Sequence, residues 1–121
     1  MTTIAAFISK SEGAMGADTG VYNIDSDLQQ SSNHPKIFLL SHSNMMIGVA
    51  GSLKALNAAA SFSVDKMFSR FENVTTFAEY MQAADIKGDW EALIYRDNGL
   101  FYMDQEGGWT RMVDPYCAIG A

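Results

Sequence analysis

The spacing of apolar residues changes twice along this 121-residue chain, and that change constrains the fold more than any other feature. Short apolar runs bounded by polar turns, which are typical of strands, fill the first 50 residues and return from residue 90. Between them, apolar residues recur at steps of three and four, as on one face of a helix. The order strands, helices, strands predicts an α+β fold with antiparallel sheet and helices packed against one face. We expect residues 1–121 to form a single domain.

The first half of the chain predicts two hairpins. The runs 2–8 and 13–18 flank the polar turn SKSEG, and the runs 36–41 and 45–50 flank the turn HSN. Between the hairpins the apolar density falls, so we expect a short edge strand near Val21 to Ile24, followed by a loop. Glycines inside the first hairpin, Gly13 and Gly16, indicate that another backbone or a ligand approaches closely there.

The middle of the chain predicts helices with capping residues. Ser52 is a suitable N-cap for the first helix, Ser63 for a short second helix, and Thr75 or Thr76 for a third. Gly88 is expected to end the helical region. The apolar residues expected to pack are Leu53, Leu56, Ala60 and Val64 in the first helix, Met67, Phe68 and Phe71 in the second, and Phe77, Tyr80, Met81 and Ala84 in the third.

The last third predicts a hairpin, a further strand and the start of another element. Asn98-Gly99 suits the two positive-φ positions of a type I′ turn between WEALIYRD and LFYMD. QEGG is the next turn, WTRMVD the next strand, and PYCAIGA begins a further element. A strand that ends in small residues leaves a sheet face uncovered. We therefore expect a partner or additional chain to cover that face.

Composition and charge exclude several classes of partner. The net charge of −6 combines fourteen acidic residues with eight basic ones, and the basic residues are scattered. A nucleic-acid surface needs clustered positive charge, so nucleic acid is not an expected partner. No apolar run approaches the ~20 residues of a membrane helix. The N-terminus lacks the basic segment and long apolar stretch of a secretory signal, so a cytoplasmic location is expected.

No motif indicates a metal or a cofactor. Cys117 is the single cysteine, which excludes an intramolecular disulfide and a Cys-based zinc site. His34 and His42 form neither an HxxxH nor an HExxH spacing, and His34, before a proline in a polar loop, is expected to be solvated. Neither GxxxxGK[ST] nor GxGxxG occurs, so no sequence motif indicates nucleotide binding.

Two threonines directly after Met1 suggest a nucleophile. A hydroxyl is weak at neutral pH and needs a base, and a threonine at a true N-terminus supplies one, because its α-amino group titrates near 8. Thr2 would reach this state when Met1 is removed. Such a site also needs a cation near the hydroxyl, a carboxylate that holds the cation, and backbone N–H groups for the oxyanion. A glycine-containing turn from a strand into a helix suits the last task.

Five segments, in order along the chain, resemble the N-terminal nucleophile (Ntn) hydrolases, specifically the proteasome β-subunit and HslV, the peptidase of the bacterial two-component heat-shock protease. They are TTI at 2–4, GAMGADTG at 13–20, KIFLL at 36–40, IGVAGS at 47–52, and LIYRDNGLFYMDQEGG at 93–108 followed by YCAIGA. The resemblance implies a four-layer αββα sandwich of antiparallel sheets. It also implies a threonine peptidase that cleaves peptides or unfolded proteins, assembles as a homo-oligomeric ring and works with an ATP-driven unfoldase.

The resemblance also assigns roles to individual residues. Thr2 corresponds to the nucleophile, Asp18 to the orienting carboxylate, and Lys36 to the cation that tunes the nucleophile. Gly51 corresponds to the donor of the oxyanion N–H. The remaining two residues, Thr19 and Ser52, correspond to contacts with the substrate or to supporting contacts.

Departures from the family pattern keep other functions open. The family's Gly-Ser-Gly serine falls at Ala121, and the family continues for roughly a third more chain. A retained Met1 would place the Thr2 nitrogen in an amide and remove the proposed base. The alternative is therefore a catalytically silent subunit of a larger assembly, such as a virion component. A third interpretation is an amidohydrolase of the same superfamily with a substrate other than a peptide.

Overall fold

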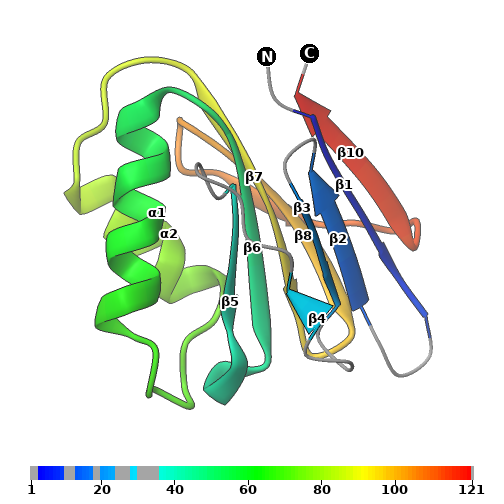
Figure 1. The fold of residues 1–121 in the computed structure, drawn as a ribbon. Coiled ribbons are helices and arrows are strands. Elements are labelled where there is room, and N and C mark those ends of the chain that lie inside the picture. Colours follow the sequence, from blue (N-terminus) through cyan, green and yellow to red (C-terminus); the bar gives the residue numbers. More distant parts are fainter. Residues whose placement is uncertain (1–2, 10–12, 18–19, 24–27, 30–35, 121) are drawn as a thin grey trace.

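Two antiparallel sheets stacked face to face, with two helices on one outer side, make up the structure, which is a computed structural model (Figure 1). It describes residues 3–9, 13–17, 20–23, 28–29 and 36–120. One sheet has the strand order β10-β1-β2-β3-β4 and is called the N-terminal sheet below. The other has the order β5-β6-β7-β8-β9 and is called the helix-covered sheet. The predicted α+β class with antiparallel sheets is confirmed.

The N-terminal sheet joins the two ends of the described chain. Its strands are β1 (Thr3–Ile8), β2 (Gly13–Ala17), β3 (Gly20–Asn23), β4 (Leu28–Gln29) and β10 (Tyr116–Gly120). β1 pairs with β2 from Ile4↔Ala17 to Ile8↔Gly13, which confirms the first hairpin. The strand expected near Val21 is β3, but it is not an edge strand, because β4 pairs with its outer side. β10 adds to the free side of β1, with Thr3 opposite Gly120.

The helix-covered sheet consists of antiparallel neighbours in chain order, with both helices inserted between β6 and β7. Its strands are β5 (Ile37–Leu40), β6 (Met45–Gly51), β7 (Trp90–Arg96), β8 (Gly99–Asp104) and β9 (Trp109–Arg111). The second predicted hairpin is confirmed, with a 3-10 turn (Ser41–Ser43) between β5 and β6. Asn44 closes that turn in the left-handed region, at φ 53°.

The turn between β7 and β8 lies one residue earlier than Asn98-Gly99. Arg96 pairs with Gly99, and the residues with positive φ are Asp97 (51°) and Asn98 (60°). The short polar side chains of aspartate and asparagine tolerate this region, so the turn does not need glycine at either position. Gly99 instead begins β8, where an added Cβ would lie 3.0 Å from the Phe101 ring.

The helices begin at side-chain caps. α1 (Leu53–Asp65) begins after Ser52, whose hydroxyl accepts a hydrogen bond from the Ala55 N–H at 3.3 Å, as predicted. α2 (Val74–Ala83) begins after Asn73, not after Thr75 or Thr76. Thr76 is the partner in a capping box, because its hydroxyl accepts from the Asn73 N–H while Asn73 accepts from the Thr76 N–H.

The predicted helix after Ser63 does not form. Ser63 lies inside α1, where its hydroxyl donates to the Ala60 carbonyl at 2.8 Å instead of capping a new helix. The chain then leaves the helix in a turn, and the side chains of Phe68 and Phe71 are exposed. The expectation that this segment packs its apolar residues is therefore wrong.

The prediction for α1 holds in part: Leu56 and Ala60 are half-buried and pack against the core, but the fully buried residues are others. Leu53 and Val64, at its two ends, are 67% and 65% exposed. The buried residues are Ala55, Ala59 and Phe62. In α2 the prediction holds for Phe77 and Met81, which are buried, whereas Tyr80 is half-buried and Ala84 is an exposed C-cap. Phe62 meets the rings of Phe77 and Tyr80 edge to face, at 5.2 and 5.3 Å between centroids.

Two apolar cores follow from this layering. One lies between the helices and the helix-covered sheet and includes Val49, Phe62, Phe77 and Ile94. The other lies between the two sheets and includes Ile4, Met15, Met46 and Leu93. The sheets approach closely: a Cβ added to Gly48 would lie 2.6 Å from Ile4 Cγ2, and one added to Gly13 would lie 2.4 Å from the Tyr95 ring. The close approach at Gly13 is therefore made by the Tyr95 side chain and not, as predicted, by another backbone or a ligand.

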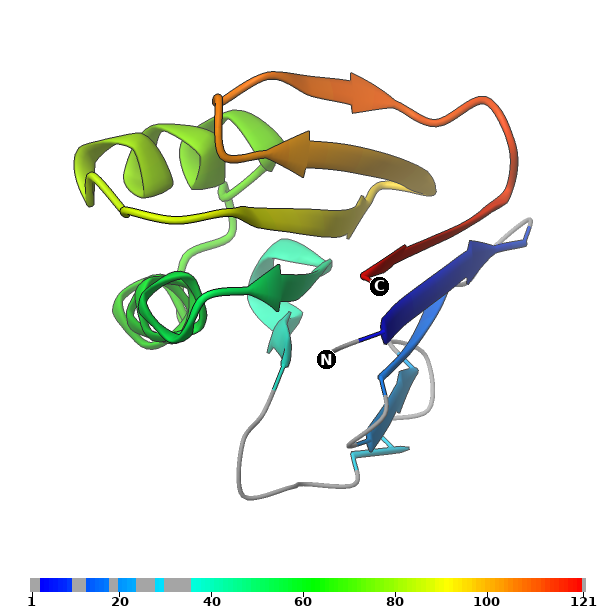
Figure 2. The same ribbon diagram turned by 90° about the horizontal axis from the view of Figure 1, so that it is seen from above.

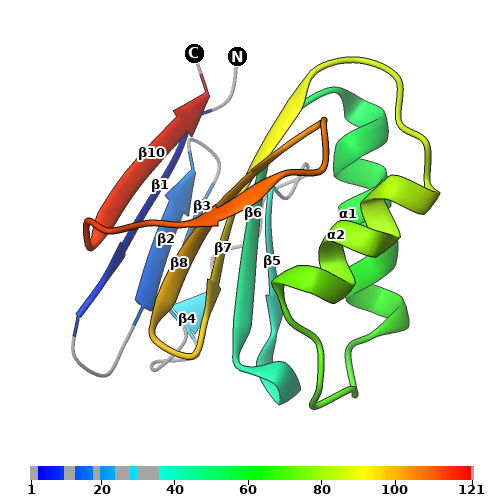
Figure 3. The ribbon, with the colours of Figure 1, turned by 180° about the vertical axis from the view of Figure 1, so that it is seen from behind.

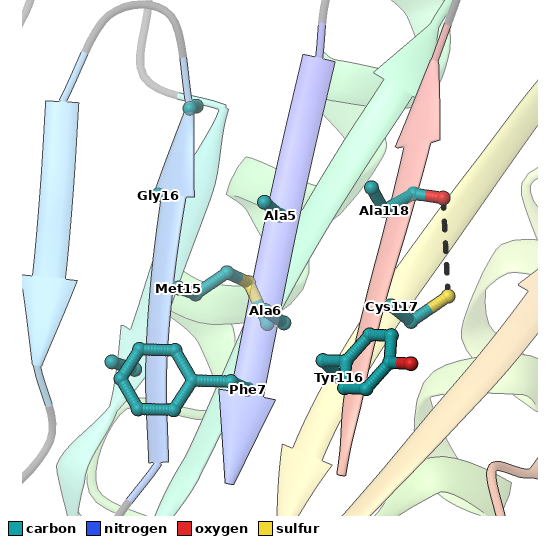
Figure 4. A pocket seen from close by; sticks show the side chains of 10 residues that line it. Ala5, Ala6, Phe7, Met15, Gly16, Tyr116, Cys117 and Ala118 are labelled. Atoms are coloured by element: carbon teal, nitrogen blue, oxygen red, sulfur yellow. Dashed lines mark hydrogen bonds between the residues drawn. The ribbon is translucent and has the colours of Figure 1, made fainter. Parts of the chain in front are cut away.

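The outer face of the N-terminal sheet is apolar, and no helix in the described part of the chain covers it (Figure 3). Both described helices lie on the opposite side of the sandwich, so the described residues form three of the four layers that the resemblance implies. A groove of about 690 Å³ lies on this face. Ala5, Gly16 and Ala118 line it, with the larger rings of Phe7 and Tyr116 at one end (Figure 4). Among the described residues, this sheet face is therefore uncovered.

Candidate functional site

Three of the six predicted site residues, Thr2, Asp18 and Thr19, lie outside the described residues. Their roles stay predictions. The structure does describe the residues next to them, Thr3 at the start of β1 and Ala17 at the end of β2. Ile4 pairs with Ala17, so the start of β1 and the end of β2 lie at the same end of the N-terminal sheet.

Gly51 and Ser52 form the turn that leads from β6 into α1. Gly51 has a φ of 137°, and an added Cβ would lie 2.5 Å from the Asp89 carbonyl oxygen and 2.6 Å from Trp90 Cα. Both the conformation and the space therefore require glycine. The Ser52 N–H donates to Asp89 O at 3.3 Å, and its hydroxyl caps α1. The local structure thus gives Ser52 the role of N-cap of α1.

Lys36 directly precedes β5, and its side chain is half-buried. Its carbonyl oxygen accepts a hydrogen bond from the Val49 N–H at 2.9 Å, which extends the pairing of β5 with β6. Because β5 and β6 are antiparallel, the start of β5 and the end of β6 lie at the same end of their sheet. Lys36 and Gly51 therefore lie at one end of the helix-covered sheet.

The start of β1 in the N-terminal sheet and the passage from β6 to α1 in the helix-covered sheet lie at the same end of the sandwich. The end of β10 lies there too (Figures 1 and 3). Viewed along the sandwich, the start of β1 and the end of β10 lie side by side, and β6 runs away from them toward α1 (Figure 2). The three described site residues, Lys36, Gly51 and Ser52, belong to this end.

A carboxylate that the sequence reasoning missed also lies at this end. Glu91, in β7, is opposite Ala50 and adjacent to Trp90, the partner of Gly51. Its Oε2 accepts a hydrogen bond from the Tyr102 hydroxyl at 2.9 Å, and its Oε1 accepts one from the Gly120 N–H at 2.8 Å. In the sequence Glu91 is a polar residue in an alternating strand pattern, so only the tertiary structure reveals these contacts.

The environment of Glu91 alters the acidity of its neighbours. Burial, followed by the hydrogen bond to Glu91 and its charge, raises the pKa of Tyr102 to about 12. Burial also raises the pKa of the Cys117 thiol, and the Glu91 charge adds to this increase. Both groups are therefore neutral near pH 7.

The described part of the chain offers no cluster of three or more histidine, cysteine, aspartate or glutamate residues suited to a metal ion. None of the helices described is long and apolar enough to span a membrane. Of the predicted site residues that the structure describes, none lines the 690 Å³ groove on the N-terminal sheet. The described site residues Lys36, Gly51 and Ser52 thus lie apart from that groove.

Comparison with solved structures places this arrangement among proteasome-like folds. The chain is similar to Anbu, the ancestral β-subunit, from Yersinia bercovieri, with a TM-score of 0.66 and 16% identity over 98% of this chain. It is also similar to the helical assembly of the Anbu complex from Pseudomonas aeruginosa (TM-score 0.64, 11% identity, 98% of this chain and 60% of that one). A third similar structure is HslV from Trypanosoma brucei (TM-score 0.56, 17% identity, 98% and 71%).

These likenesses establish the fold. The chain spans 60% of the length of the Yersinia Anbu chain. No protein-family model matches the chain, and no curated protein matches it. The class that the fold defines is therefore the proteasome-like fold, in the part that comprises two antiparallel sheets and the helical layer on one of them.

Proposed function

We propose that this chain is a threonine-type peptidase of the proteasome-like fold, with Thr2 as its nucleophile after removal of Met1. The observation that carries the proposal is the convergence of the start of β1, Lys36 and the Gly51 turn at one end of the sandwich. A lysine there would stabilise the developing alkoxide. The N–H groups at the start of α1 would face an oxyanion.

In the proposed reaction, Thr2 supplies both the nucleophile and the base. The free α-amine of Thr2 takes the hydroxyl proton, the oxygen attacks the peptide carbonyl, and the departing amine receives the proton. Water then hydrolyses the ester that joins Thr2 to the acyl fragment. Asp18 would hold Lys36, and Thr19 would contact the substrate backbone. In this proposal the substrate is a peptide or unfolded protein, delivered to a homo-oligomeric chamber by an ATP-driven unfoldase. The helical assembly of the Pseudomonas Anbu complex supports the oligomeric part.

The test combines mass spectrometry with peptide hydrolysis. We expect a mature mass that lacks Met1, hydrolysis of fluorogenic peptides, and loss of that hydrolysis in Thr2→Ala. Thr75→Ala, at an exposed position of α2, is the matched control and should keep full activity. Retention of Met1 together with undiminished hydrolysis by Thr2→Ala would refute the proposal.

A second candidate is a structural subunit without catalysis, such as a virion component. The apolar outer face of the N-terminal sheet favours it, because a contiguous apolar surface is typical of a contact site. This candidate predicts an assembly in sedimentation experiments and no hydrolysis by the Met1-free chain. Turnover that depends on Thr2 would exclude it.

A further inference from the structure

Glu91 bridges the two sheets at the end where the proposed site lies. One carboxylate oxygen holds Tyr102 of β8, in its own sheet, and the other holds the Gly120 N–H of β10, in the N-terminal sheet. Hydrogen bonds to an ionised carboxylate are among the stronger ones in proteins. The Tyr102 contact is part-buried, whereas the Gly120 contact is exposed to solvent.

The Gly120 N–H is directed toward this carboxylate by the strand register. β10 is an edge strand, and β1 is its neighbour. The Ile8 N–H donates to Pro115 O at 2.7 Å, and the alternation of an antiparallel ladder then turns the Gly120 N–H away from β1. An outward N–H of an edge strand has no strand partner, and Glu91 accepts it. Gly120 has a φ of 96°, a conformation that favours glycine.

The bridge acts on the start of β1 through one residue pair. Thr3 lies opposite Gly120, and Thr2 precedes Thr3 in the chain. We propose that Glu91 is a positioning residue: by fixing the end of β10 to β7 and β8, it holds the start of β1 in place, and with it the Thr2 nucleophile relative to Gly51. This inference rests on the proposed function for its catalytic consequence, while the bridge itself does not.

Two substitutions at position 91 separate positioning from charge. Glu91→Ala removes both contacts. Glu91→Gln keeps one oxygen for the Gly120 N–H and offers an amide N–H to the Tyr102 oxygen, so it preserves the bridge without the charge. Tyr102→Phe removes one anchor of the carboxylate and leaves Gly120 its acceptor. Glu79→Ala, an exposed glutamate of α2, is the matched control.

We expect kcat for peptide hydrolysis by Met1-free protein to fall roughly ten- to a hundred-fold in Glu91→Ala, because small misplacements of reacting groups have effects of this size. KM should change less. Glu91→Gln should recover most of the loss, Tyr102→Phe should lie between them, and Glu79→Ala should match the parent chain. A Glu91→Gln variant as impaired as Glu91→Ala would assign the effect to charge and overturn the positioning role.

Amide hydrogen exchange tests the bridge without reference to activity. Exchange of the Gly120 N–H should accelerate in Glu91→Ala and stay near the parent rate in Glu91→Gln. The pKa of Tyr102, raised to about 12 in part by Glu91, should fall toward its ordinary value in Glu91→Ala. Unchanged Gly120 exchange in Glu91→Ala would overturn the bridge, and faster exchange with unchanged kcat would overturn its positioning role. Absence of Thr2-dependent hydrolysis in the parent would refute the proposed function, whereas Gly120 exchange would still decide the bridge.

Discussion

The two outer faces of the sandwich are both apolar, but they differ in the size of their side chains and in what covers them. The outer face of the helix-covered sheet presents branched and long side chains, including Val49, Ile94 and Met103, which interlock with Phe62 and Phe77 of the helices. The outer face of the N-terminal sheet presents mainly alanine and glycine around a groove. Large interlocked side chains stabilise the fold, whereas a floor of small residues leaves room for a partner surface.

The largest expected effect is a difference in folding stability between equivalent substitutions on the two faces. Phe62→Ala removes a fully buried ring from the helical layer and should lower the free energy of unfolding by about 3–5 kcal/mol. Phe7→Ala makes the same chemical change on the bare face, where the ring is 52% exposed, and should lower it by less than about 1 kcal/mol. Urea denaturation of both variants measures the difference. Equal losses would show that the bare face contributes to the fold as much as the covered one.

A somewhat smaller effect is expected between the sheets. Gly48→Val places a side chain where even a Cβ would lie 2.6 Å from Ile4 Cγ2 and 2.8 Å from Met15 Sδ. The sheets must separate, which should lower the free energy of unfolding by about 1–3 kcal/mol. Gly108→Ala is the control, because a Cβ there meets nothing within 4 Å. If thermal denaturation shows the same stability for both variants, the sheets are less closely packed than the structure indicates.

The attachment of the helical layer depends on the cap of α2. Asn73→Ala breaks the capping box and should lower the free energy of unfolding by about 1 kcal/mol. Thr75→Ala, at an exposed position in the first turn of the same helix, should change it by less than about 0.5 kcal/mol. Chemical denaturation followed by circular dichroism compares the two. A larger effect of Thr75→Ala would return the cap to the position that the sequence first indicated.

The smallest effect on stability is expected on the bare face. The double variant Phe7→Ser, Tyr116→Ser removes the two rings at one end of the groove and should leave the free energy of unfolding within about 1 kcal/mol of the parent. It should nevertheless reduce the binding of an apolar dye such as ANS. Val113→Ser, at a 98% exposed position, is the control and should bind the dye as the parent does. Unchanged dye binding by the double variant would place the exposed apolar surface elsewhere.

Local signals predicted the elements well and their details less well. The two early hairpins and the Ser52 cap followed from runs and residue types within a few positions of each other, and the structure confirms them. The turn at Asp97-Asn98 and the cap at Asn73 differ from the predictions by one to three positions. In both cases neighbouring residues have similar local preferences. The register of β7 with β8 sets the turn, and the capping box of Asn73 with Thr76 sets the cap.

The predicted site residues also differ in what the structure says about them. The glycine requirement at Gly51 combines a local conformation with the proximity of Asp89 and Trp90, which are distant in sequence. Lys36 lies at the same end of the helix-covered sheet as Gly51. Thr2, Asp18 and Thr19 lie outside the described residues, so the resemblance alone supports their roles. Glu91 escaped prediction because its partners, Tyr102 and Gly120, are 11 and 29 residues away.

The order of strands and helices, the α+β class and the likeness to proteasome-type chains follow from the amino-acid sequence alone, because apolar periodicity and short motifs are local properties of a chain. Which face of α1 is buried and which face of the N-terminal sheet stays bare follow only from the fold. It also placed Glu91 between the sheets. These features depend on contacts between segments far apart in sequence, and local preferences differ too little in free energy to determine them.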